Sequence, residues 1–162
     1  MRSKKVTPQN QLIIFDVQEN TKTPVCPTNG KLGKPVNTRT LKALLNVSLT
    51  EVRETTYRFC PDASCPTVYY SEDGLQLFVE SNIRERVYQK HSNEEDVLIC
   101  YCFFHTVGNI RKDITEHDPP VILAAINAGV KAGQCACDIR NPQGSCCLGN
   151  VNNLVKSIQV VQ

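Results

Sequence analysis

The chain lacks the C-x-x-C motif, although nine of its 162 residues are cysteines. No two of these cysteines are three residues apart, which excludes a thioredoxin-type redox motif and the usual knuckle of a zinc finger. Long apolar runs are missing as well, and none approaches the roughly 20 residues that span a bilayer. Whatever chemistry the cysteines perform must therefore use other spacings.

Strong charge of one sign is also absent, because the formal net charge is only +2. The sequence thus gives no electrostatic reason to expect nucleic acid or an anionic membrane as a partner. The polar start of the chain has no signal-peptide core, so we expect a cytoplasmic protein. Thiols stay reduced in that compartment, and the odd number of cysteines also argues against a disulfide framework.

The patterning predicts an α+β chain whose first half is mainly β. Asn37 or Thr38 is placed to cap a short helix that runs to Leu45. Cys60 and Cys65 lie between two of the expected strands, so this half is built around a cysteine-bearing hairpin. The expected strands are residues 12–17, 56–59, 67–70 and 75–79.

From Val97 the pattern becomes helical. Thr106 is a plausible N-cap, the segment Asp118-Pro-Pro120 separates two helices, and Gly129 and Gly133 are expected to end the second. A last helix is predicted over residues 149–158. The charged segment 89–96 has the composition of a linker, which predicts two small units, residues 1–90 and 97–162.

Six of the nine cysteines lie from residue 100 onward, as Cys100-Tyr-Cys102, Cys135-Ala-Cys137 and Cys146-Cys147. Thiols at this density in a reducing compartment indicate a metal site. Four thiolates satisfy either a closed zinc site or an iron–sulfur cluster, and the spacing alone leaves both open. Two of the six cysteines would then be non-ligating.

Two segments of this half resemble a known family. Ile99-Cys-Tyr-Cys-Phe-Phe-His-Thr106, and the stretch from Gly133 to Val151 with its Asn141-Pro-Gln-Gly144 and Cys146-Cys-Leu-Gly149 motifs, are similar to the N-terminal region of CopZ-type copper chaperones. The resemblance covers residues 97–151 closely and residues 25–71 less closely. It implies a β-rich zinc-ribbon-like domain followed by a helical [2Fe–2S] domain similar to bacterioferritin-associated ferredoxin. It also implies Cys100, Cys102, Cys137 and Cys147 as cluster ligands, with Cys135 and Cys146 as bystanders.

The remaining cysteines, Cys26, Cys60 and Cys65, would form a structural Zn²⁺ site if a fourth ligand were supplied. The family commonly has C-P-x-C at the first of these positions, but here Asn29 stands in place of the second cysteine. The candidates for the fourth ligand are Asp62, His91, His105 and water.

The sequence shows no Ser/His/Asp, Cys/His or paired-carboxylate constellation, so we expect a redox or metal-binding protein more than an enzyme. The resemblance implies electron transfer in copper homeostasis, by Cu(II) reduction or Cu(I) hand-over. Its partners would be a copper protein or copper-transporting ATPase and an electron donor. The chain lacks M-x-C-x-x-C, the motif of a copper-delivering domain. The alternatives are a zinc- or Cu(I)-thiolate binding module and an interaction scaffold in which metal only stabilises the fold.

Overall fold

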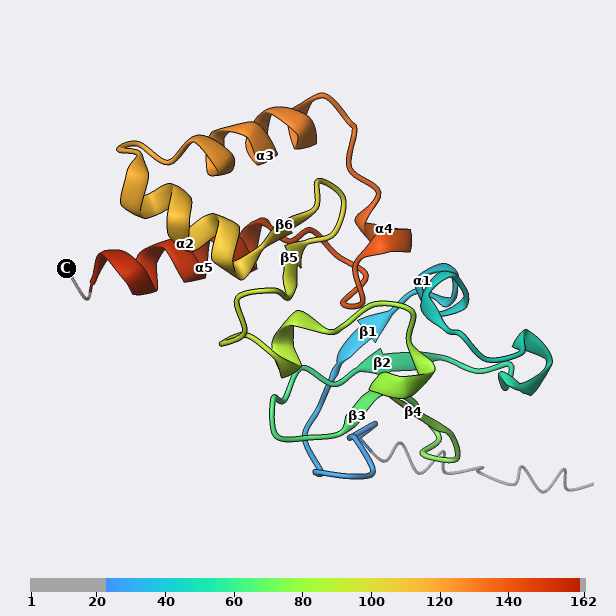
Figure 1. The fold of residues 1–162 in the computed structure, drawn as a ribbon. Helices are drawn as coiled ribbons and strands as arrows, with labels where there is room; N and C mark the ends of the chain where they lie inside the picture. The colour runs from blue at the N-terminus through green and yellow to red at the C-terminus, as the bar shows by residue number, and fades with distance from the viewer. Residues whose placement is uncertain (1–22, 161–162) are drawn as a thin grey trace, which may run out of the picture.

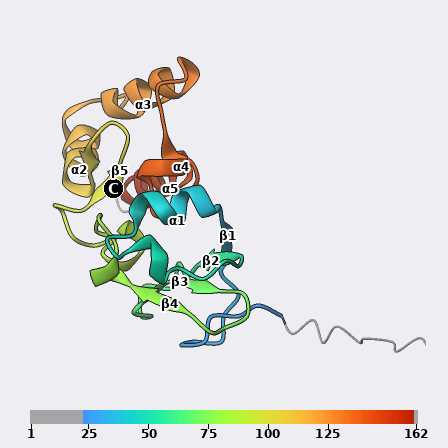
Figure 2. The ribbon, with the colours of Figure 1, turned by 90° about the vertical axis from the view of Figure 1, so that its right-hand side faces the viewer.

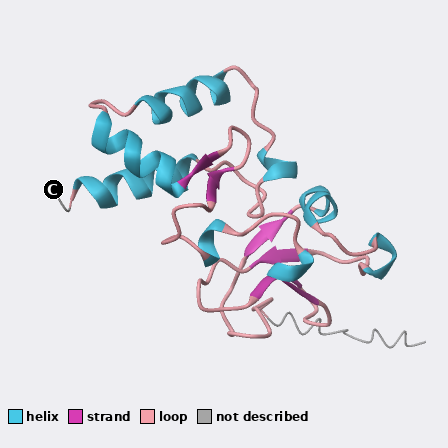
Figure 3. Cartoon of the chain, viewed as in Figure 1, coloured by secondary structure: helices cyan, strands magenta, loops and turns pink. Residues whose placement is uncertain are grey.

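The computed structural model describes residues 23–160 (Figure 1). The strand expected at residues 12–17 lies outside this range. Among the described residues, no helix is both long enough and apolar enough to cross a membrane. Figures 1 and 3 show a β-rich first half below a mainly helical second half, in agreement with the expected mixed α and β class.

The first half is a four-stranded antiparallel sheet in the order β1-β2-β3-β4. Helix α1 (Thr38–Leu44) follows the first strand, and the Asn37 side chain caps it by accepting a hydrogen bond from the Arg39 N–H at 2.8 Å. The helix and three of the strands lie close to their predicted positions, whereas the first strand was not predicted. The strands are β1 Lys34–Val36, β2 Tyr57–Phe59, β3 Thr67–Ser71 and β4 Leu77–Val79.

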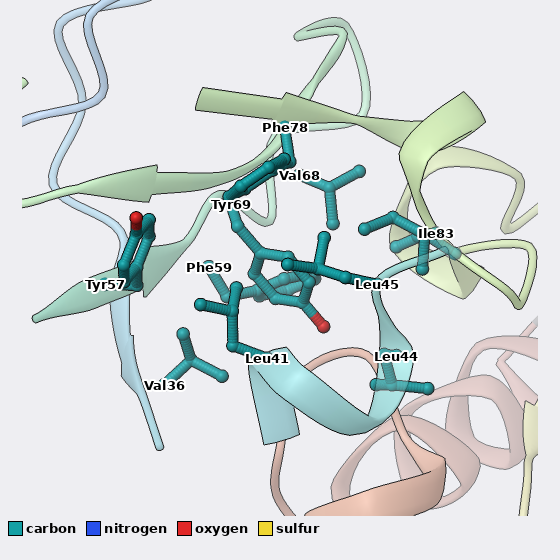
Figure 4. Close-up of a cluster of buried hydrophobic side chains, with 11 residues drawn as sticks. Val36, Leu41, Leu44, Leu45, Tyr57, Phe59, Val68, Tyr69, Phe78 and Ile83 are labelled. Atoms are coloured by element: carbon teal, nitrogen blue, oxygen red, sulfur yellow. The ribbon is translucent and has the colours of Figure 1, made fainter. Parts of the chain in front are cut away.

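The core of this half lies between the sheet and α1. Leu41 and Leu44 from the helix face Phe59 and Tyr69 from the strands, and all four are buried (Figure 4). Tyr69 and its neighbour Tyr70 are both completely buried, because adjacent residues of a strand point to opposite faces and both faces of β3 are covered. Tyr69 joins the core against α1, and Tyr70 packs beside Cys26, Cys60 and Cys65.

The second half begins with a two-stranded ribbon and continues into four helices. Thr106 caps α2 as predicted, in a reciprocal pair of hydrogen bonds with Asn109. Gly129 lies inside α3 and does not end it, whereas Gly133 follows the helix with a positive φ of 69°. The elements are β5 Leu98–Cys100, β6 His105–Thr106, α2 Val107–Glu116, α3 Val121–Lys131, α4 Cys137–Arg140 and α5 Leu148–Gln159.

The two halves meet where α4 and the turn after it lie on α1 (Figure 2). The Thr40 hydroxyl donates to the Asp138 carbonyl at 2.6 Å, and the Tyr69 hydroxyl donates to the Pro142 carbonyl at 2.6 Å. Gly144 contacts Thr40 so closely that a Cβ at this position would lie 3.1 Å from its hydroxyl. The turn between Cys137 and Cys146 is therefore supported by the first half.

The segment predicted as a linker, residues 89–96, also contacts both halves. Its first two residues belong to a 3-10 helix, η3 (Tyr88–Lys90). Lys90 donates to the Asp62 carbonyl at 2.6 Å, and Gln89 donates to the Gln143 side chain at 2.6 Å. The charge and low hydrophobicity of residues 89–96 predicted a solvated linker between the two halves. The side chains of Gln89 and Lys90 instead form hydrogen bonds with residues of both halves. The division into units 1–90 and 97–162 remains a prediction.

Candidate metal centres

The first thiol centre consists of Cys26, Cys60 and Cys65, whose sulfurs all lie within 4.8 Å of one another. The sulfurs of Cys26 and Cys65 are 3.9 Å apart. Cys26 begins the turn that Gly30 closes by donating to its carbonyl, Cys60 follows β2, and Cys65 lies just before β3. All three are buried, so the hairpin and the turn hold three thiols at the separation of ligands to one ion.

Backbone donors surround this centre. Burial raises the pKa of the Cys26 thiol, but the N–H groups of Asn29 and Thr28 outweigh it and hold the pKa below its ordinary value. Burial raises the pKa of the Cys60 thiol to about 11. The Asn29 side-chain amide donates to the Cys60 sulfur at 3.5 Å. N–H groups directed at sulfur stabilise the thiolate form that a metal ion requires.

None of the candidate protein ligands completes the first thiol centre. The Asp62 carboxylate is engaged by Lys31 and by Ser64. His91 lies between Glu80 and Glu94, with ring nitrogens 2.7 and 2.6 Å from their carboxylates. His105 lies in β6, in the other half of the molecule. Among residues 23–160, the group of mutually close metal-ligating atoms contains the three thiols alone.

The second thiol centre consists of Cys100, Cys102, Cys137 and Cys147. The sulfurs of Cys102 and Cys137 lie 3.6 Å apart. The Cys147 side chain lowers the pKa of the Cys100 thiol to about 7 against the opposing effect of burial. Cys100 in turn raises the pKa of the Cys147 thiol, as burial does. Burial raises the pKa of Cys137 to about 12, with Cys102 adding to the effect.

The sulfurs of the second thiol centre are spread more widely than those of the first. No three sulfurs of the second thiol centre meet the 4.8 Å limit that the first centre meets within the described chain. Ligands of a single tetrahedral ion with bonds of about 2.3 Å would all lie about 3.8 Å apart. The four thiols are thus too widely spread for one ion, whereas Cys102 and Cys137, with sulfurs 3.6 Å apart, have the spacing of two ligands on one ion.

Local structure fixes these four residues. Cys100 ends β5 and Cys102 lies in the following turn, whereas Cys137 is the first residue of α4 and Cys147 precedes α5. The Ala136 N–H donates to the Cys102 sulfur at 3.2 Å. Of the two expected bystanders, Cys146 is exposed and Cys135 is half-buried.

Three contacts at these centres were not predicted from the sequence. Tyr70 packs against the first thiol centre, Tyr69 reaches the turn that precedes Cys147, and Asn29, expected only as a missing ligand, contributes a donor to Cys60. The alternation along β3 could have placed the two tyrosines on opposite faces. No local pattern indicates the Asn29 contact, which joins residues 31 positions apart.

Comparisons with known proteins agree with this picture. Residues 23–97 match a family model, zf_CopZ, described as a zinc binding domain. This chain is similar to the X-ray structure of the CopZ N-terminal domain from Archaeoglobus fulgidus, with a TM-score of 0.61 and 26% sequence identity. The match covers 80% of this chain and 96% of that domain. A search of curated proteins found no match. The chain is therefore similar to the CopZ N-terminal domain, and the three-cysteine cluster lies in the segment that matches the zinc-binding-domain model.

Proposed function

We propose that this protein is an iron–sulfur electron-transfer and metal-handling protein. In this proposal Cys100, Cys102, Cys137 and Cys147 hold a [2Fe–2S] cluster, with two thiols on each iron. The observation that carries the proposal is that the sulfurs of Cys102 and Cys137 lie 3.6 Å apart, whereas no three of the four thiols lie within 4.8 Å of one another. A closed zinc site would need all four thiols around a single centre.

The chain's own groups suit this role. A bound [2Fe–2S] cluster supplies one-electron transfer, at a potential that hydrogen bonds to sulfur and exposure adjust. The Ala136 N–H already donates to the Cys102 sulfur, and α5 begins directly after Cys147 with its partial positive charge beside that thiolate. Cys100 and Cys147 are almost fully buried, whereas Cys102 is half-buried. Electrons would therefore enter and leave on the side of Cys102.

The wider role follows from the likeness to CopZ. One electron delivered to Cu(II) yields Cu(I), which a copper protein or a copper-transporting ATPase would then receive, and an electron donor would reduce the cluster again. Because M-x-C-x-x-C is missing, we propose that the chain acts as a redox partner in copper homeostasis. The first thiol centre would hold zinc and stabilise the β-rich half, which is small enough to benefit from a metal.

Metal and labile-sulfide analysis, with a visible spectrum, tests the proposal on protein purified without oxygen. We expect two irons and two sulfides per chain and a red-brown colour with a charge-transfer band. Zinc alone, with no iron or sulfide after anaerobic reconstitution, would overturn the redox role and leave a zinc- or Cu(I)-thiolate binding module.

The ligand assignment is tested by a matched pair of variants. Cys137→Ser is expected to lose the charge-transfer band, and Cys135→Ser, two residues away, is expected to keep it. Loss of the band in Cys135→Ser alone would overturn the assignment.

A further inference from the structure

We propose that the first thiol centre is a Cu(I) site of three thiolates and that Cu(I) displaces zinc from it. Cys26, Cys60 and Cys65 would surround the ion in a trigonal arrangement, with Asn29 as a hydrogen-bond donor to Cys60 and not a ligand. This inference rests on the metal-handling part of the proposed function and is independent of the iron–sulfur cluster. It gives copper a binding place in a chain that lacks M-x-C-x-x-C.

An inventory of ligands supports a three-coordinate site. The six other cysteines all lie at or beyond residue 100. His105 lies in β6, and His117 lies beside Asp113 at 3.0 Å. His91 lines a pocket with Cys65, but both its ring nitrogens are hydrogen-bonded to Glu80 and Glu94. Residues 1–22 contain neither cysteine nor histidine. Among residues 23–160, no fourth thiolate or imidazole therefore lies within the 4.8 Å that joins the three sulfurs.

Asn29 stands where the family's C-P-x-C motif would supply a fourth sulfur. Its amide nitrogen is directed at the Cys60 sulfur at 3.5 Å, and its carbonyl oxygen accepts from the Lys31 N–H at 2.9 Å. Both ends of the amide are thus in use. An N–H donor stabilises a thiolate without coordinating the metal, so the substitution removes a ligand and retains support for the remaining three.

The number of thiolate ligands distinguishes a Zn²⁺ site from a Cu(I) site better than the sulfur–sulfur distance does. With metal–sulfur bonds of about 2.3 Å, two thiolates lie about 3.8 Å apart around a tetrahedral ion and about 4.0 Å apart around a planar trigonal one. The 3.9 Å between Cys26 and Cys65 fits both. Zinc in structural sites takes four ligands, so here it needs one from outside the chain, whereas Cu(I) is selected by soft thiolates. Three thiolates alone therefore favour Cu(I).

The surroundings suit a monovalent ion that enters and leaves. Three thiolates around Cu(I) carry a net charge of −2, and two lysines are nearby: Lys31 pairs with Asp62, and Lys90 donates to the Asp62 carbonyl. Cys60 and Asp62 line a surface pocket of about 360 Å³ together with Lys31. The sulfurs are shielded from bulk water, and the pocket gives an ion a short path to Cys60.

The test titrates Cu(I), buffered by a colorimetric chelator, into the zinc-loaded full-length protein and follows zinc release with an indicator dye. We expect about one zinc released per chain as Cu(I) binds. Asn29→Cys restores four thiolates, so its zinc release at the same free Cu(I) is expected to fall about tenfold or more. Cys146→Ser, in the other half, is expected to release zinc like the unmodified chain.

Two results would overturn the inference: zinc retained by the unmodified chain in excess Cu(I), or equal release from the Asn29→Cys variant. A separate measurement covers a variant that fails to fold. X-ray absorption at the copper edge of the unmodified chain, compared with Cys65→Ser, should show a three-sulfur component that the variant lacks, and its absence would also overturn the inference. Iron and sulfide content, measured in the same samples, reports separately on the proposed cluster.

Discussion

The two thiol centres of this chain differ in how their sulfurs are spaced. The first gathers three sulfurs within 4.8 Å, as one ion requires. The second has four thiols, of which Cys102 and Cys137 lie 3.6 Å apart, but no three of the four lie within 4.8 Å of one another. The number of cysteines therefore does not define a metal site, because two groups of thiols in one chain differ in how their sulfurs are spaced.

The supporting structures differ too. The first thiol centre is built on a hairpin and a tight turn, so two of its thiols flank strands β2 and β3 and the third, Cys26, lies in the turn. The second is built on a ribbon turn and two helix starts, and its close pair Cys102–Cys137 joins positions 35 residues apart. Strand β3 serves both, because Tyr70 packs on the first centre and Tyr69 contacts the turn before the second. The predictions below test how far the centres are independent.

The largest expected effect is the selective loss of one metal. Cys65→Ser should lose the ion of the first thiol centre and retain iron, whereas Cys137→Ser should lose iron and retain the first ion, because no ligand is shared. Elemental analysis of both purified variants measures this, with Cys146→Ser as the control. Loss of both metals in either variant would mean that the centres are built as one unit.

Many of the helices and strands that carry the two thiol centres depend on local sequence and are therefore predictable from it. Asn37 and Thr106 cap their helices as expected, because a cap depends on residues two or three positions away. Strand β1 was missed because Pro35 lacks an N–H, which is tolerated on the edge strand that β1 forms. Helix α4, with four residues, is too short to show a helical period.

Long-range contacts could not be predicted in this way. The density of the cysteines and the family likeness predict which cysteines are candidate metal ligands. It does not indicate that Cys102 pairs with Cys137, or that Asn29 turns its amide toward Cys60. These contacts depend on how separate elements pack, and that is determined by the buried surface of the whole chain.

A smaller effect is expected where Tyr69 joins the two halves. Tyr69→Phe leaves the Pro142 carbonyl without its donor in a buried place, which costs about 1–3 kcal/mol of the free energy of unfolding. We also expect faster loss of iron, because this turn precedes Cys147. Chemical unfolding and the decay of the charge-transfer band measure the two effects.

Tyr70→Phe is the matched control for Tyr69→Phe. Its hydroxyl accepts from the Gly33 N–H at 2.7 Å and donates to the Pro24 carbonyl at 2.9 Å, both beside the first thiol centre. It should destabilise the protein similarly but leave the rate of iron loss unchanged. Equal rates of iron loss in the two variants would contradict a specific role of the Tyr69 contact.

Packing around the turn that carries Cys102 gives an effect of similar or smaller size. A Cβ on Gly129 would overlap the ring of Phe103, the residue after Cys102. Gly129→Ala is therefore expected to lower the free energy of unfolding by about 1–3 kcal/mol. Gly149→Ala in α5 meets no neighbouring atom and should stabilise by up to about 1 kcal/mol through helix propensity. Urea unfolding of both variants checks the opposite signs, and destabilisation by Gly149→Ala would contradict the packing argument.

The smallest expected effect is a pH dependence in the segment that connects the halves. Hydrogen bonds to Glu80 and then Glu94 raise the pKa of His91 above its ordinary 6.5, against the effect of burial. The protonated ring therefore contributes its full stabilisation below pH 6.5, and the contribution is lost as the pH rises through the raised pKa. A partly exposed pair of this kind contributes about 0.5 kcal/mol. The difference in unfolding free energy between the unmodified chain and His91→Gln should thus be largest below pH 6.5 and decrease as the pH rises through the raised pKa of His91. Both proteins are compared at each pH, so the effect of protonating the thiolates cancels from the difference in unfolding free energy. A difference that grows with pH would contradict this prediction and show that His91 acts as a neutral hydrogen-bonding group.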